Sequence, residues 1–249
     1  MTARGPGRSL ARALVVAAAT TGITAGSAQA ATVNIGSSLA GSVNGSAIAL
    51  SPITVVNTGV DPPGVVASPT DGTVISWKFF GKGPLTPRVV HPLGGGLYVG
   101  AGTGTSTLGA GDGLLSGPFT VNLPIKKGDL FGWDYAPGGS YNGHNTPNGS
   151  RIGWTPPLAD GGAGRAQSGG DPGEGLVQAT VRYCLVPKVR GKTPKAAKNA
   201  LRAADCTVGK VKKSKKTAKK KKVIKQSAAA GSSISDTQPV NLTVSRKAG

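Results

Sequence analysis

The chain contains few of the residues that usually carry enzyme chemistry. Its 249 residues include two histidines, two cysteines and one methionine, and aromatic residues make up only 4%. His91 and His144 lack the His, Cys and carboxylate spacing of a zinc site, and no Gly-x-Ser-x-Gly motif accompanies them. The composition therefore predicts no catalytic residue, no metal site and no cofactor.

Phosphate-binding loops and base-stacking surfaces are also missing. The glycine-rich run 94–104 has no Lys-Ser/Thr pair after it, and Gly191-Lys192-Thr193 has Val186 where a Walker loop needs glycine. No aromatic residue follows Tyr183, so nothing in the basic C-terminal part can stack on bases. We therefore expect no nucleic acid partner.

No apolar run is long enough to cross a bilayer, which takes about 20 residues. An apolar stretch, Ala13–Ala19, follows three arginines and precedes small residues that end at Ala30. This order is typical of a secretory signal peptide. We predict a signal peptide over residues 1–30, cleavage between Ala30 and Ala31, and a secreted, envelope-associated protein without stable membrane insertion. A retained N-terminal anchor is the alternative.

Acidic residues are scarce in one part of the chain only. Residues 31–183 contain 8 basic and 8 acidic residues, whereas residues 184–249 contain 18 basic and 2 acidic residues. This change of charge, close to the glycine-rich stretch 161–175, predicts two domains, 31–183 and 184–249. The C-terminal domain therefore carries most of the chain's net charge of +19.

Residues 31–183 are rich in Gly, Pro, Thr and Ser, and short apolar runs between turn signals predict strands. The predicted strands are residues 74–79, 88–90, 97–99, 119–123, 130–133 and 176–181. In the first of them Ser76 and Lys78 alternate with Trp77 and Phe79, as expected of a sheet with one buried face. We predict a mainly β protein that begins with an antiparallel, jelly-roll-like β-sandwich.

Three segments of the same part, residues 67–77, 123–129 and 154–161, resemble uncharacterised secreted β-rich domains of actinobacteria. The resemblance implies a sandwich with exposed loops at its ends. It implies no activity.

The few aromatic residues of this domain suggest either core packing or glycan binding. We expect Trp77 and Trp133 to fill the core, because large aromatic side chains dominate the cores of small sandwiches. Tyr141 and Trp154 are predicted to form a surface pair that stacks on sugar rings. A glycosidase is the catalytic alternative, and it would need two facing carboxylates such as Asp134 and Asp160.

The C-terminal part predicts one helix and three strands. Thr193 is suited to a helix N-cap and Pro194 to the first helical position, so a helix is expected from Pro194 to about Ala204. Its small apolar face would pack on a sheet formed by residues 206–212, 222–227 and 240–245. The predicted module is therefore a small α+β unit, one helix on a three-stranded sheet.

Several motifs of this part occur in the order found in PASTA domains, which take their name from penicillin-binding proteins and serine/threonine kinases. They are Val186-Pro187-x-Val189-x-Gly191, Ala197-x-x-x-Leu201-x-x-Ala204, Gly209-Lys210-Val211, Val223-Ile224-x-Gln226-Ser227 and Val240-Asn241-Leu242-Thr243-Val244. The chain from Cys184 to about Lys247 resembles this family, which implies binding to peptidoglycan stem peptides or glycan strands. A lysine-rich insertion at 212–222, expected to be a basic hairpin, departs from the family pattern.

The lysines of this insertion are candidate wall-binding residues. They are Lys212, Lys213, Lys215, Lys216, Lys219, Lys220, Lys221 and Lys222. Outside a cell, such a basic segment would meet the carboxylates of the wall and the phosphates of anionic wall polymers. The alternative is a solvated segment that keeps the module soluble.

Cys184 and Cys206 are the only cysteines. An even pair in an exported chain favours a disulfide, and two free buried thiols are the alternative.

Three function classes follow. The first is a secreted, non-catalytic wall-binding protein whose partner is peptidoglycan or an anionic wall polymer, with a glycan or protein partner at the sandwich loops. The second is a structural or adhesive surface protein whose PASTA-like module is a spacer or a protein contact. The third is a wall or glycan hydrolase with its site in the sandwich.

Overall fold

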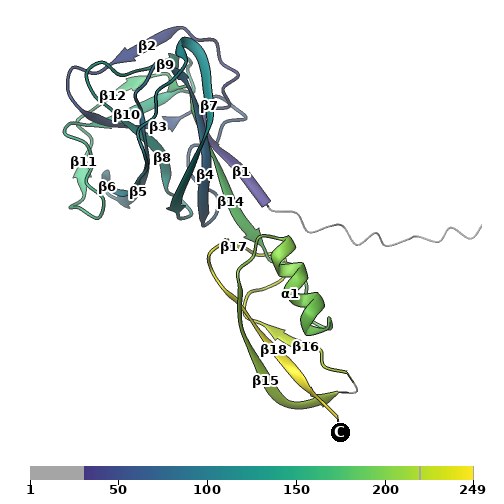
Figure 1. The fold of residues 1–249 in the computed structure, drawn as a ribbon. Helices are drawn as coiled ribbons and strands as arrows, with labels where there is room; N and C mark the ends of the chain where they lie inside the picture. The colour runs from purple at the N-terminus through teal and green to yellow at the C-terminus, as the bar shows by residue number, and fades with distance from the viewer. Residues whose placement is uncertain (1–30, 219, 249) are drawn as a thin grey trace, which may run out of the picture.

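The structure, a computed structural model, describes residues 31–218 and 220–248. Within them the chain forms β-sheets throughout the larger N-terminal part and a smaller module with one helix at the C-terminal end (Figure 1). The predicted mainly β fold with a small α+β module is thus confirmed. The predicted signal peptide and Ala30 lie outside the described residues, and Ala31 is the first residue of strand β1.

Two large antiparallel sheets form the sandwich. The first contains, in order, β1 (Ala31–Gly36), β14 (Val177–Leu185), β4 (Gly72–Gly81) and β7 (Gly111–Ile125), and β17 (Ser233–Ser235) also pairs with β14. The second contains β11 (Arg165–Ala166), β6 (Leu97–Thr103), β5 (Thr86–Gly94), β8 (Leu130–Tyr135), β3 (Ile53–Gly59), β10 (Ser150–Trp154) and β12 (Gly169–Pro172). All six predicted strands fall within these sheets, apart from a one-residue difference at the start of β14.

A third, small sheet corrects one prediction. It consists of β13 (Glu174–Gly175), β9 (Ser140–His144) and β2 (Gly45–Ile48). The segment that includes Tyr141 and His144 was not among the predicted strands, and it is rich in Asn and Gly, which strands rarely contain. Its backbone instead pairs with β2 on one side and β13 on the other.

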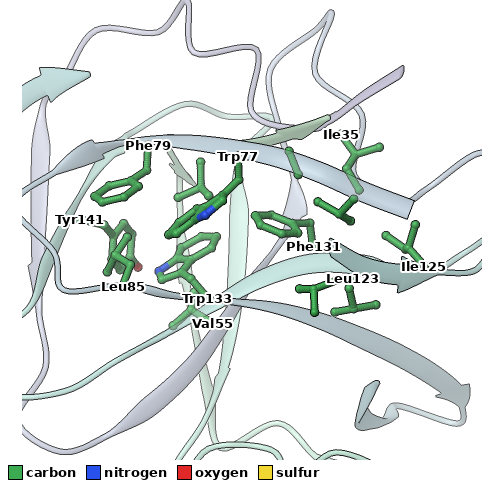
Figure 2. Packing of buried hydrophobic residues seen from close by; sticks show 14 of the residues in the cluster. Ile35, Val55, Trp77, Phe79, Leu85, Leu123, Ile125, Phe131, Trp133 and Tyr141 are labelled. Carbon is green, nitrogen blue, oxygen red and sulfur yellow. The ribbon is translucent and has the colours of Figure 1, made fainter. Parts of the chain in front are cut away.

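Aromatic side chains from both large sheets fill the space between them (Figure 2). Trp77 and Phe79 of β4 stack with ring centroids 5.0 Å apart, and Trp77 also meets Phe131 of β8 at 6.1 Å. Trp133, from β8, is fully buried in the same core. Because large aromatic rings bury the most apolar area per residue, these side chains dominate the packing. The prediction that Trp77 and Trp133 fill the core is confirmed.

The second sheet is covered on its other face as well. Val56 and Val90 are the sequence neighbours of core residues, and alternation along a strand turns them to the opposite face. There they pack in a separate cluster with Trp154 and Leu158. Consequently the centre of this sheet is buried on both faces.

In the C-terminal module, helix α1 (Pro194–Ala203) packs on a three-stranded sheet. The backbone N–H of Ala196 donates to Oγ1 of Thr193 at 3.3 Å, which confirms Thr193 as the N-cap. Ala197 and Leu201 on one face of α1 are buried with Leu242 and its neighbours on β18 (Val240–Lys247). The small alanine lets the helix lie close to the sheet.

The lysine-rich insertion does not form a hairpin. It begins inside β15 (Val208–Ala218), which pairs in parallel with β18, and β16 (Val223–Gln226) pairs antiparallel with the other edge of β18. Strand β18 therefore separates the two strands that a hairpin would join. Lysines are rare in strands, so the sequence suggested a strand that ended at Lys212. Pairing with β18 extends it to Ala218.

Strand β14 runs from the sandwich into the C-terminal module without interruption, through the predicted boundary between Tyr183 and Cys184. It pairs with β4 as far as Arg182, and β17 then pairs with Tyr183–Leu185. Beside this junction the buried Asp236 accepts hydrogen bonds from Thr73 Oγ1 at 2.7 Å and Arg182 Nε at 2.9 Å. Main-chain pairing and a charge-assisted hydrogen bond thus connect the two parts.

Cys184 at the end of β14 forms a disulfide with Cys206, which follows α1, and both are buried. The predicted disulfide is confirmed. The described residues contain no free cysteine.

We expect the double substitution Cys184→Ala/Cys206→Ala to lower the free energy of unfolding of the C-terminal module by about 3 kcal/mol. The bridge joins residues 22 apart, and a loop of this size loses roughly that much chain entropy when it is closed. Hydrogen exchange of residues 194–246, followed by mass spectrometry, would measure the change. Exchange as slow as in the oxidised wild type would contradict the prediction, and the wild type in reducing buffer is the matched control.

Candidate functional site

The predicted wall-binding lysines lie on two different segments. Lys212, Lys213, Lys215 and Lys216 belong to β15, whereas Lys220, Lys221 and Lys222 belong to the connection to β16. All seven are exposed, and Lys219 lies outside the described residues. The structure thus spreads these lysines along one strand and one connection.

Two of them join rows that cross the whole sheet, and only Lys212 shares its row with another lysine. Thr243 on β18 is paired with Lys212 on β15 and with Lys225 on β16. Paired residues point to the same face of a sheet, and Leu242 and Val244, which alternate with Thr243, face the helix. Lys212, Thr243 and Lys225 therefore lie on the face opposite α1, and strand spacing separates the two lysine Cα atoms by about 10 Å.

This face, which we call the open face, is hollowed into a groove of about 790 Å³. The groove is lined by polar residues from all three strands, among them Lys210, Lys212, Lys225, Ser227, Asn241 and Thr243. Sequence analysis did not identify Lys210, Lys225, Asn241 or Thr243 as site residues. No sequence pattern showed that they share a face, because strand register is a tertiary property.

Asn241 organises the centre of the groove. Its Oδ1 accepts a hydrogen bond from the backbone N–H of Lys210 at 2.7 Å, and its backbone N–H donates to Ser227 Oγ at 2.9 Å. A Cβ atom on Gly209 would clash with Asn241 Oδ1, so any other residue there would displace the Asn241 amide. The glycine of the Gly-Lys-Val motif thus allows Asn241 to bridge β15 and β18.

Carboxylates are absent from the described part of the open face. The acidic residues of the module are Asp205 and Asp236, and both form their ion pairs with Arg182 at the junction. Among the residues that the structure describes, no lysine forms an ion pair. Exposed lysines without acidic partners leave an uncompensated positive potential that attracts anions.

The sandwich shows a different pattern, because four of its aspartates form ion pairs with arginine or histidine side chains of the same domain. The buried Arg88 contacts Asp134 at 3.2 Å and Asp160 at 3.0 Å, so the two carboxylates suggested for a glycosidase are joined through one guanidinium. Burial raises the pKa of Asp134. The pair therefore has a structural explanation in neutralising Arg88.

Each histidine also has a carboxylate partner. His91 Nδ1 lies 2.5 Å from Asp129 Oδ1, and His144 Nε2 lies 3.2 Å from Asp61 Oδ2. Hydrogen bonds from Thr146 and Asn148 lower the pKa of Asp61. Within residues 31–218 and 220–248, no group of three His, Cys, Asp or Glu side chains has the geometry to hold a metal ion.

The prediction that Tyr141 and Trp154 form a sugar-stacking surface pair is wrong. Tyr141 is 2% exposed and packs edge-on against Trp133, while Trp154 is fully buried against Tyr98. Tyr141 lies in β9 and is buried in the core between the sheets, and Trp154 lies in β10 and is buried in the separate cluster with Leu158. Neither ring offers a free face to a glycan.

Residues 185–246 match the PASTA domain family, a range that contains α1 and the residues of the open face. The C-terminal module is therefore a PASTA domain, as its motifs predicted. Domains of this family bind peptidoglycan-related ligands. No curated protein and no solved structure matches the chain. In the part of the chain that the structure describes, no helix is both long and apolar enough to span a membrane.

One carboxylate of the sandwich yields a pH prediction. Glu174 is fully buried, its Oε1 has no hydrogen-bond partner, and burial raises the pKa of its carboxyl. The pKa of a glutamate carboxyl in the unfolded chain is about 4.3. A higher pKa in the folded protein stabilises the fold at pH values below about 4.3, and this stabilisation is lost as the pH rises through the pKa of the folded state. We expect Glu174→Gln to raise the free energy of unfolding at pH 7.5 by about 1 kcal/mol, with no gain at pH 4.

Urea unfolding followed by tryptophan fluorescence at both pH values measures this difference, since all three tryptophans lie in the sandwich. The exposed Asp171→Asn is the matched control and should show no such gain. A destabilised Glu174→Gln protein at pH 7.5 would contradict the prediction.

Proposed function

We propose that the protein is a secreted, non-catalytic cell-wall-binding protein whose PASTA domain holds an anionic wall polymer on its open face. The observation that carries the proposal is the row Lys212–Thr243–Lys225, in which two lysines flank a groove without any acidic residue. Peptidoglycan stem carboxylates and polymer phosphates are the groups this row would bind.

Charge and family support the same ligand class. Residues 184–249 contain 18 basic and 2 acidic residues, while the sandwich is balanced. Because the PASTA domain is positive and the sandwich is neutral, the PASTA domain would be the part that approaches the anionic wall. The PASTA family is associated with peptidoglycan-related ligands, so the chemistry of the open face agrees with the family.

The disulfide supports a location outside the cytoplasm, because disulfides persist in oxidising compartments. The carboxylates of the sandwich that contact Arg88 and the histidines support a non-catalytic role, since they already have partners within the protein.

A second function, that of a spacer, is favoured by the junction. The continuous β14, its pairing with β17 and the hydrogen bonds of Asp236 would hold the sandwich at a defined distance from the wall. The two roles are compatible: the PASTA domain would bind the wall and present the sandwich to the surroundings.

The test is sedimentation of the purified protein with insoluble sacculi. Because exposed charges are screened by salt, we expect retention to fall steeply between 50 mM and 500 mM NaCl. The double substitution Lys212→Gln/Lys225→Gln should weaken binding by about fivefold to tenfold, which corresponds to two exposed charge contacts. Sacculi stripped of phosphate polymers would distinguish peptidoglycan from those polymers as the ligand.

The matched control is Lys195→Gln/Lys198→Gln, which removes the same charge from α1 on the other side of the sheet. This pair should change binding less than twofold. Equal losses for both pairs would show that net charge alone retains the protein, and a wild type that stays in the supernatant would refute wall binding.

A further inference from the structure

The sandwich contains a cleft of about 390 Å³ between the small sheet and one end of the second large sheet. Strands β2, β9, β3, β10 and β12 contribute its walls, in the upper part of the view in Figure 1. The volume lies in the range of small-molecule sites. This cleft is far from the open face in sequence and belongs to the other domain, so it is independent of the wall-binding role proposed above.

Arg151 supplies the positive charge of the cleft. Its Nη1 donates to Tyr141 Oη at 3.3 Å and its Nη2 donates to the carbonyl oxygen of Pro172 at 3.2 Å. The buried Nε has no hydrogen-bond partner. A guanidinium has five N–H donors, so these contacts leave donors unused.

No carboxylate neutralises Arg151 within the described residues. Asp171 stands directly opposite it in the β10–β12 pair, yet the two side chains form no ion pair. Arg88, which lies deeper in the same sheet, has two carboxylate partners. Arg151 thus enters the cleft wall with its charge not paired to a carboxylate.

The orientation of Arg151 depends on its neighbours. Its guanidinium lies 5.6 Å from the centre of the Tyr141 ring, and Tyr141 is itself held edge-on by Trp133 and Tyr135. A Cβ atom on Gly143 would come within 2.9 Å of Arg151 Nη1, so glycine in β9 leaves the space that the guanidinium occupies. The arginine is therefore positioned before any ligand binds.

Apolar side chains form the other part of the cleft. Ile53 and Ile152 line it, and Ile48 at its rim is 73% exposed. A ligand in the cleft that covered Ile48 would remove apolar surface from water, which is favourable. A ligand that matched this cleft would carry a negative group at one end and an apolar body at the other.

We propose that this cleft binds a small organic carboxylate with an apolar body, the carboxylate accepting hydrogen bonds from Arg151 and the body covering Ile48. A guanidinium and a carboxylate form two parallel hydrogen bonds, which explains the choice of anion. Asp171 opposes this binding by repulsion, because it also lines the cleft. Its substitution by Asn should therefore strengthen binding.

The experiment uses the full-length protein, with hexanoate as the probe. Hexanol is the control that lacks the charge, and acetate is the control that lacks the apolar body. The indole N–H of Trp133, whose ring contacts Tyr141 at 4.8 Å, is the NMR reporter. We expect saturable shifts with hexanoate in the millimolar range and much weaker effects from both controls. Equal binding of hexanol, or no saturable binding of hexanoate, would overturn the proposal.

Variants separate the two halves of the cleft. Arg151→Gln should weaken hexanoate binding about tenfold or more, whereas Arg202→Gln, which removes a charge from α1, should leave it unchanged. Ile48→Ser should weaken hexanoate binding several-fold without affecting folding, and Leu50→Ser, 93% exposed in the wild type and outside the cleft, is its control. If Ile48→Ser and Leu50→Ser bind equally, or if Arg151→Gln binds like the wild type, the assignment is wrong.

Discussion

Strand β14 is the element on which both domains depend. Its first residues, Val177, Ala179 and Val181, are buried in the core of the sandwich, and Cys184 is buried in the core of the PASTA domain. Because one extended strand has side chains in both cores, displacement of either domain would strain the other. The disulfide joins the end of this strand to Cys206, which follows α1 in the chain. Strand β17 pairs with the part of β14 that lies beyond its pairing with β4. A 62-residue family domain with a single helix thus obtains support from a covalent bridge and from its neighbour.

Charge is distributed around this strand in a way that keeps acidic residues away from the open face. Both acidic residues of the PASTA domain lie at the junction, where Arg182 at the end of the β14–β4 pair contacts them. The lysines lie on the far strands without such partners. If Asp205 or Asp236 stood on β15 or β16 instead, an internal ion pair would compete with an external anion. The junction therefore satisfies two requirements together: it fixes the two domains, and it removes negative charge from the open face.

The strongest sequence predictions concerned features with local physical causes. Thr193 and Pro194 fix a helix start through dihedral preference and capping, so α1 was predicted within one residue of its observed end. Trp77 and Phe79 alternate with polar residues, and this pattern indicated both the strand and its buried face. The disulfide was predicted because the chain has only two cysteines and an expected signal peptide.

The errors concerned features that depend on partners far away in the sequence. Tyr141 was predicted to lie on the surface, yet β2 and β13 make its segment a strand and Trp133 packs against its ring. Trp154 was misplaced for a similar reason, since the chain segment that contains Leu158 covers the outer face of β10. The lysine-rich segment looked like a hairpin because no local pattern shows that β18, later in the chain, inserts between β15 and β16.

By itself the sequence determined the mainly β composition, the one helix, the disulfide pair, the PASTA motifs and the separation of charge between the two parts of the chain. These follow from residue type and short-range spacing, which act within a few positions. The tertiary structure alone decided which lysines share a face, which carboxylates are already neutralised, and that Arg151 stands in a cleft without an acidic partner. Those facts depend on strand register and on contacts between residues as much as 163 positions apart, as for Thr73 and Asp236, and such contacts are formed only when the whole chain packs.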